Sequence, residues 1–267
     1  KRPIRGIRLG HSKIEEVKKT KDIEHPIIQT ILKYLNIKTD RGLEIVSIGD
    51  FPAGTGMGAS GSFTVGLLNA LNQMLKKKTS TKVLAKNACH INIDLLKSPS
   101  GIQDEYIAAY GGITCFKVNK KGIVKTYPLN ISNNTIKKLH SNLLMFYTGV
   151  IRNSNNILTK QRDKTLKKDN ETISNLLSIQ KIGYEIKNAL EKGNTNLFGE
   201  LMDKHWMIKR KRDGTTSKII DNWYKIAKDN GALGGKIMGA GAGGFPFGRA
   251  CSSCGAQAPS SRSLRPP

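Results

Sequence analysis

The stretch Phe51-Pro-Ala-Gly-Thr-Gly-Met-Gly-Ala-Ser-Gly-Ser62 decides the fold, because it runs directly into the apolar helix pattern of residues 63–75. Its glycines at alternate positions, Gly54, Gly56 and Gly58, let the backbone bend tightly and approach a ligand without a Cβ in the way. A helix start carries unpaired N–H groups and the positive end of the helix dipole, so it attracts anions. The stretch therefore predicts a phosphate-binding loop, with an ordinary Gly-rich turn and a Ser cap as the alternative.

The residues in front of this loop predict a strand. Residues 42–48 read Gly-Leu-Glu-Ile-Val-Ser-Ile, a short β-branched segment in which apolar and polar residues alternate. The local order is thus strand, Gly-rich loop and helix. The loop lacks the Lys that follows the last Gly of a P-loop, and its glycine spacing does not fit G-x-G-x-x-G, so neither of those nucleotide-binding motifs is present in it.

Two more glycine-bounded segments lie further along the chain. Residues 98–112 hold Asp104 and Glu105 between glycines, which is typical of a general base held on a loop. Residues 230–245 form a second glycine cluster, which follows an amphipathic helix pattern over residues 217–229. Lys236 lies inside this cluster, where it could contact a phosphate or face solvent from a strand.

In these segments the chain resembles the GHMP kinases, and most of all the D-glycero-D-manno-heptose 7-phosphate kinase branch of their sugar kinases. The resemblance rests on residues 52–62, 101–112, 146–149 with Arg152 just after, and 231–245, in the family's order and spacing. It implies an α+β fold of two domains. The first would resemble ribosomal protein S5 domain 2 and the second a ferredoxin, with the active site between them.

The resemblance implies ATP-dependent phosphoryl transfer to a sugar hydroxyl, a reaction that depends on positioning and charge neutralisation. Ser60 would also reach Mg2+, whereas Ala59 lacks the hydroxyl that relatives carry in a Ser-Ser pair. The ATP phosphates would bind the first loop, at Gly54, Thr55, Gly56, Met57, Gly58, Ala59, Ser60, Gly61 and Ser62.

Asp104 matches the family's catalytic Asp, which orients or deprotonates the attacking hydroxyl. Glu105 stands where relatives often have Gln, so its charge is interpreted as a surface feature. Asn92 stands where this branch carries a Glu that completes Mg2+ binding, and a neutral amide can ligate only through its carbonyl oxygen. Asn92 is therefore a candidate metal ligand that brings no charge.

The candidate substrate residues come from both halves of the chain. Arg152 could bind a sugar phosphate bidentately or be a surface Arg. His205 and Trp206 could line the sugar pocket, or they could be a core residue and a helix-capping residue. The candidate substrate set is Gly101, Gln103, Thr148, Arg152, Gly239 and Gly241.

The resemblance places an N-terminal domain at residues 1–135, incomplete at its start, and a C-terminal domain at residues 136–245, incomplete at its end. Residues 160–171 are expected to form a charged, mobile connector. At Pro246 the composition shifts abruptly from Lys, Ile and Asn to Pro, Ala, Arg and Gly, as after a frameshift or a junction. Residues 246–267 are therefore expected to be a disordered, non-family tail without the strand that relatives have there, and the lone Cys251-x-x-Cys254 pair does not predict a zinc site.

Composition narrows the class of protein. The net charge of +24 suggests a nucleic-acid partner, but aromatic residues make up only 6%, and nucleic-acid proteins usually interleave aromatics with their cations. A general Lys bias explains the charge, which would still steer ATP and phosphorylated sugars to the protein. The few cysteines argue against a disulfide framework, and no apolar run reaches the ~18 residues of a membrane span. We expect a cytoplasmic protein without nucleic-acid or membrane partners, and a homodimer is left open.

Three hypotheses from different classes follow. The first is a kinase acting on a heptose 7-phosphate or a related sugar. The second is a relative that binds ATP and sugar with weakened catalysis, suggested by Asn92 and Ala59. The third is a basic nucleic-acid-binding protein, suggested by net charge alone.

Overall fold

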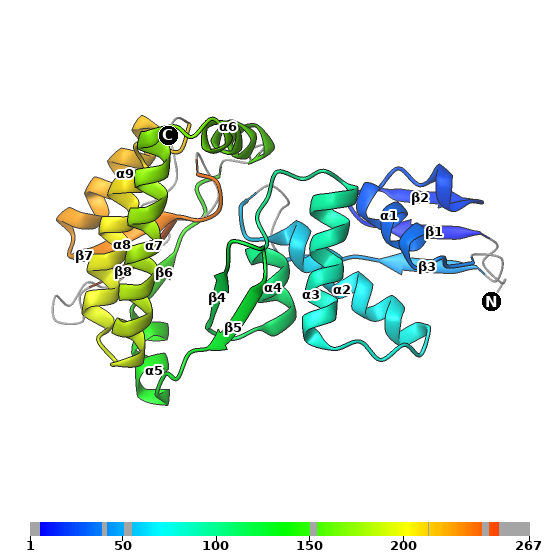
Figure 1. The fold of residues 1–267 in the computed structure, drawn as a ribbon, viewed down its shortest axis with the longest axis horizontal. Coiled ribbons are helices and arrows are strands. Elements are labelled where there is room, and N and C mark those ends of the chain that lie inside the picture. The colour runs from blue at the N-terminus through cyan, green and yellow to red at the C-terminus, as the bar shows by residue number, and fades with distance from the viewer. Residues whose placement is uncertain are drawn as a thin grey trace. The chain divides into compact units, whose positions relative to one another are not determined.

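The computed structural model describes residues 6–38, 42–50, 55–149, 154–212, 214–241 and 246–250 (Figure 1). The chain divides into two compact units, the first Lys1–Ala53 with Gly58–Val124 and the second Gly54–Met57 with Lys125–Pro267. The domain boundary at residue 135 that the sequence suggests stays a prediction. Within the described residues, no helix combines the length and apolar character needed to cross a membrane.

The first unit begins with a three-stranded sheet in the order β2 (Ile14–Val17), β1 (Ile7–Gly10), β3 (Leu43–Val46). β1 pairs antiparallel with β2 and parallel with β3. A parallel pair needs a crossover, and the segment between these strands contains α1 (Pro26–Tyr34). Ile7 and Leu9 alternate along β1 and are both buried, so one face of the sheet forms part of the core.

Three helices continue the first unit. They are α2 (Ala59–Met74), α3 (Thr81–Cys89), which runs on as a π-helix over His90–Leu95, and α4 (Gln103–Tyr110). β4 (Thr114–Val118) follows, and β4 and β5 (Val124–Pro128) form a two-stranded sheet. The core joins the sheet to the helices through apolar side chains, among them Leu9, Ile28, Ile31, Leu68, Ala88 and Ile91.

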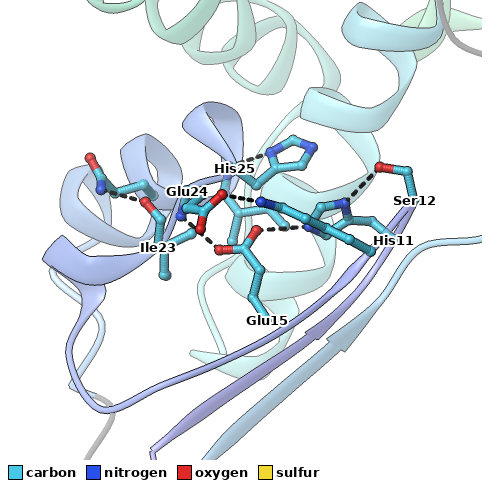
Figure 2. A network of polar contacts seen from close by, with 9 residues as sticks. His11, Ser12, Glu15, Ile23, Glu24 and His25 are labelled. Carbon is cyan, nitrogen blue, oxygen red and sulfur yellow. Dashed lines mark hydrogen bonds and ion pairs between the residues drawn. The ribbon is translucent and has the colours of Figure 1, made fainter.

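A polar network fixes the start of α1 to the β1–β2 hairpin (Figure 2). The buried Glu15 carboxylate accepts the Glu24 backbone N–H at 2.7 Å and hydrogen-bonds His11 Nε2 at 2.8 Å. His25 accepts the Ile28 N–H through Nδ1 and thereby caps α1, and its ring packs edge-on against His11. This network satisfies a buried carboxylate and a helix terminus together, so it is structural.

The second unit contains α5 (Asn133–Asn142), β6 (Leu143–Met145), α6 (Ser154–Leu166), α7 (Asn170–Glu191), α8 (Thr195–Lys209), α9 (Lys218–Asp229), β7 (Ala232–Ile237) and β8 (Pro246–Ala250) (Figure 1). Its sheet has the order β6-β8-β7, with antiparallel pairs. α8 packs on β7 and against α7. At Gly234 a Cβ would lie 2.1 Å from the Gly199 carbonyl oxygen, so glycine is what lets β7 lie so close to α8.

Two expectations about the second unit are wrong. Residues 160–166 belong to α6 and form no connector, because Lys, Arg, Gln and Leu are good helix formers and a polar exposed helix has the same charge pattern as a linker. Residues 246–250 form β8 at the centre of the sheet, where ladder hydrogen bonds on both sides hold a strand that has no hydrophobic pattern. Pro246 is tolerated because it is the first residue of the strand. The expected tail at residues 251–267 lies outside the described residues.

Candidate active site

The N-terminus of α2 has no side-chain cap among the described residues. Its N-cap is Gly58, with a φ of 70° and no side-chain cap. Most other helices whose N-cap is described do have a side-chain cap, which accepts a hydrogen bond from a backbone N–H of the first turn. These helices are α1, α3, α5, α7, α8 and α9, and the exception is α4. The α2 start also has no acidic residue in its first turn. Its N–H groups and the positive end of its dipole therefore suit an anion such as phosphate.

Two glycines bring α4 against this helix start. A Cβ at Gly61 would lie 2.8 Å from Asp104 Cβ and 3.1 Å from the Glu105 backbone nitrogen. A Cβ at Gly58 would lie 3.2 Å from Asp104 Cγ, and the positive φ of Gly58 is itself disfavoured for other residues. Glycine at both positions thus places the Asp104 carboxylate beside the start of α2. This confirms only that these predicted residues meet; their roles stay predictions.

Asp104 lies in the first turn of α4, not on a loop as the glycine boundaries suggest. α4 also has no side-chain cap at its N-cap, Ile102, so a second open helix start lies beside the first. Burial raises the pKa of the Asp104 carboxyl. A raised pKa makes the ionised carboxylate a stronger proton acceptor, as a general base requires.

A buried series of hydrogen-bonded side chains holds α4 on the face that packs against the core. Thr64 Oγ1 donates to Asn92 Oδ1 at 3.0 Å, and Asn92 Nδ2 donates to Glu105 Oε1 at 2.7 Å. All three residues are buried, and Glu105 Oε2 has no hydrogen-bond partner. Burial, and less strongly Asp104, raise the pKa of Glu105. The interpretation of Glu105 as a surface charge is wrong, because this face of α4 packs on the core.

A sequence signal for the burial of Glu105 exists. Ala108 and Ala109 follow it at helical spacing of three and four residues, and both pack against the core of the first unit. Because the segment is short and bounded by glycines, it resembles a loop, and that hides the helical periodicity. The role of Glu105 as a partner of Asn92 is therefore missed by sequence reasoning.

The metal-binding candidates differ in their surroundings. Ser60 is exposed in the first turn of α2, with its side chain free to reach a ligand held at the helix start. Asn92 is buried, and both ends of its amide are already engaged by Thr64 and Glu105. No group of three or more His, Cys, Asp or Glu side chains that could hold a metal ion occurs among the described residues. These donors fit Mg2+ only as an ion held largely by phosphate oxygens and water, which is a common arrangement.

The remaining predicted residues are distributed over both units. In the first unit, Gly101 lies directly before α4, where a Cβ would come 2.7 Å from Oε1 of Gln103, the first residue of that helix. In the second unit, Gly239 and Gly241 follow β7, and Gly241 packs on Thr215 with a φ of 105°. Thr148 follows β6 and is buried.

Thr55, Gly56 and Met57 are described as part of the second unit, whereas Gly54 and Arg152 lie outside the described residues. Trp206 is fully buried with Ile220 and Ile237, so its interpretation as a core residue is confirmed.

Comparison with known proteins supports the resemblance to the GHMP kinases. The family model for the GHMP kinases N terminal domain matches residues 25–112, and the model for GHMP kinases C terminal matches residues 186–250. Both predicted glycine segments and Asp104 fall within these matches. The second match includes β8, which agrees with its central place in the sheet.

Individual proteins agree with the family models. A D-glycero-alpha-D-manno-heptose 7-phosphate kinase of Campylobacter jejuni is 30% identical over 85% of this chain and 66% of its own length. A putative sugar kinase structure from Campylobacter jejuni matches with a TM-score of 0.67 and 25% identity, over 91% of this chain and 72% of that one. A Streptococcus pneumoniae phosphomevalonate kinase structure has a TM-score of 0.72 at 13% identity, over 92% and 79% of the two chains, and so shows the fold alone.

The chain thus spans about two thirds of the length of the heptose phosphate kinase that it matches. The two family models, the α+β fold and the meeting of Gly58, Gly61 and Asp104 are mutually consistent. The chain belongs to the GHMP kinase family.

Proposed function

We propose that this protein is an ATP-dependent kinase that transfers the γ-phosphoryl group to a hydroxyl of a small sugar. The observation that carries the proposal is the uncapped N-terminus of α2, with Asp104 held beside it by Gly58 and Gly61. One side of this arrangement suits a phosphate and the other suits a hydroxyl proton. Phosphoryl transfer needs both in one place and little further covalent chemistry.

The first-turn N–H groups of α2 would hold the phosphates of ATP, with Ser60 able to contact a bound Mg2+. That ion, when bound, neutralises charge on the phosphoryl oxygens. Asp104 would accept or orient the hydroxyl proton of the sugar, and its raised pKa suits that role. The chain of Thr64, Asn92 and Glu105 would hold the first turn of α4 in place for this role.

The substrate class is proposed from similarity. The heptose 7-phosphate kinase of Campylobacter jejuni is 30% identical, and its name specifies a phosphorylated seven-carbon sugar. A net charge of +24 would favour anionic substrates through long-range attraction. We therefore propose a heptose 7-phosphate or a related phosphorylated sugar as acceptor, with the cytoplasm as the place where ATP and such sugars meet.

The test is ADP release with ATP, Mg2+ and a sugar phosphate, comparing the wild type with Asp104→Asn. The substitution removes the proton acceptor but keeps the side-chain size. We expect a fall in kcat of about 10²–10⁴-fold, with ATP affinity retained. Asp94→Asn is the matched control, because Asp94 is exposed and pairs only with His90 among the described residues. An Asp104→Asn variant that keeps the wild-type rate would contradict the assignment.

A second candidate function is binding of ATP and sugar with weak turnover. It is favoured by one observation, the engagement of the Asn92 amide by Thr64 and Glu105, which removes this position from metal binding. Calorimetric binding of ATP by the wild type together with an undetectable rate of ADP release would establish this function instead.

A further inference from the structure

A group of basic side chains gathers where α8 meets β7, in the second unit. His205, Lys209 and Arg212 are spaced by four and three residues, so they share one face of α8 and of the turn that follows it. Lys236 lies on β7, the strand that packs on α8. Trp206 and Ile237 are buried next to this group, so it lies against the core of the unit.

Several polar atoms in this group have no hydrogen-bond partner among the described residues. They are His205 Nδ1, Arg212 Nε and Nη2, and Oγ1 of the neighbouring Thr215, and all are buried. Lys209 differs, because its Nζ donates to the carbonyl oxygens of Ile237 at 2.9 Å and Gly239 at 2.5 Å. Lys209 thus ties the end of α8 to the chain after β7, whereas His205, Arg212 and Thr215 hold polar atoms without a partner among the described residues.

The acidic side chains of the neighbouring helices are engaged elsewhere. Asp203 accepts a hydrogen bond from Tyr224 and lies 3.6 Å from Lys228 Nζ. Asp221 lies 2.7 Å from Arg210 Nη2. No ion pair joins Arg212 or Lys236 to an acid among the residues that the structure describes.

The pKa shifts in this group are those expected of several basic side chains that lie together without a nearby negative charge. Burial, followed by Lys236, Lys209 and Arg212, lowers the pKa of His205 to about 3. Burial also lowers the pKa of Lys236 and of Arg212. The C-terminus of α8 supplies only about half of one negative charge, which cannot balance three cations. Buried polar groups normally have partners, and among the described residues Arg212 Nε and Nη2 have none, so the described part of this group lacks an anion.

The donor set identifies the kind of anion. Arg and Lys side chains only donate hydrogen bonds, and neutral His205 and the Thr215 hydroxyl can each donate one more. Such a set rejects metal cations. An Arg fork matches two oxygens of a phosphate, and several cations suit a dianion better than a monoanion.

We propose that His205, Arg212 and Lys236 bind a phosphate monoester dianion, namely the phosphoryl group that the sugar substrate already carries. This inference rests on the proposed kinase function. It adds that the acceptor sugar is recognised through its existing phosphate, and it names the residues responsible.

The experiment measures the thermal midpoint and calorimetric binding of the full chain with three probes: inorganic phosphate, mannose 6-phosphate and unphosphorylated mannose. We expect both phosphates to stabilise the wild type and mannose to have no effect. Arg212→Gln should weaken binding of mannose 6-phosphate at least tenfold. Lys211→Gln is the matched control, because this neighbouring side chain is exposed and loses the same charge. ATP affinity should be the same in the wild type and in both variants.

Lys236→Met provides an independent test that does not depend on lost stability. Removing a half-buried cation that has no acidic partner among the described residues should raise the thermal midpoint in phosphate-free buffer and abolish the further rise with phosphate. In the wild type, phosphate should also raise the pKa of His205, followed by NMR of the imidazole. Equal phosphate binding by the wild type, Arg212→Gln and Lys236→Met would overturn the inference, as would loss of ATP binding in these variants. If the inference is overturned in this way, transfer of phosphate from ATP to unphosphorylated mannose would still support the proposed kinase function.

Discussion

Replacing Gly61 with Ala tests the contact on which the candidate site is built. The new Cβ would lie 2.8 Å from Asp104 Cβ and 3.0 Å from the Asp104 carbonyl carbon. Carbon atoms pack best at about 3.5–4.0 Å, so α2 and α4 must separate by several tenths of an ångström or more. The atoms that the methyl meets are backbone and Cβ atoms, which a rotamer change cannot move out of the way.

Two opposing effects set the magnitude. Overpacking costs about 1–3 kcal/mol, whereas Ala in place of Gly inside a helix gains about 0.5–1 kcal/mol. We therefore expect Gly61→Ala to lower the free energy of unfolding by about 0.5–2 kcal/mol. The effect on catalysis should be larger, because displacing a catalytic group by about 1 Å can lower the rate about 10²-fold.

Gly66→Ala is the matched control. Gly66 lies in the same helix, is exposed, and would place its Cβ with nothing within 4 Å. The Gly66→Ala variant should gain about 0.5–1 kcal/mol of stability from the higher helix propensity of Ala, and its activity should be unchanged. Urea unfolding gives the stabilities and ADP release gives the rates. If Gly61→Ala is as stable and as active as Gly66→Ala, the close contact between α2 and α4 does not position Asp104.

Three further predictions concern buried polar groups. Asn92→Glu should lower the free energy of unfolding by about 1–3 kcal/mol, because it sets a second carboxylate against Glu105. Adding Glu105→Gln should restore most of that stability in urea unfolding. Failure of the double variant to recover would contradict the pairing of residues 92 and 105. Glu15→Gln should cost about 1–3 kcal/mol in the same assay because it disturbs the bond from the Glu24 N–H, and an unchanged midpoint would refute a structural role for the network in Figure 2. Since the pKa of His205 lies at about 3 in the fold and at 6.5 ordinarily, stability should be full above pH 6.5 and decline as the pH falls towards 3; a His205→Asn variant with the same pH profile would exclude this residue as the cause.

The elements with strong local patterns could be predicted from the sequence. The apolar helix pattern of residues 63–75, which follows the first glycine loop, is observed as the helix Ala59–Met74, because its apolar periodicity and its glycine start agree. The amphipathic helix at residues 217–229 is observed as Lys218–Asp229 with a Ser217 cap. In both cases, local signals and tertiary packing favour the same structure.

The elements that depend on distant partners could not be predicted. β8 lacks a hydrophobic pattern, and it becomes a strand only through hydrogen bonds to β6 and β7 on either side. Glu105 lies in a short segment between glycines, and its burial becomes clear only when Asn92 is placed beside it. The cationic group of α8 and β7 likewise joins residues 205 and 236, which no local pattern connects.

The central claim is that a phosphate binds the N–H groups at the start of α2, beside Asp104. The most direct measurement is the change in backbone amide NMR shifts when a non-hydrolysable ATP analogue is added with Mg2+. We expect the largest changes in α2 at Ala59, Ser60 and Gly61, with Gly66 in the same helix unaffected. Saturable binding of the analogue with no change at these three amides would exclude phosphate binding at the start of α2.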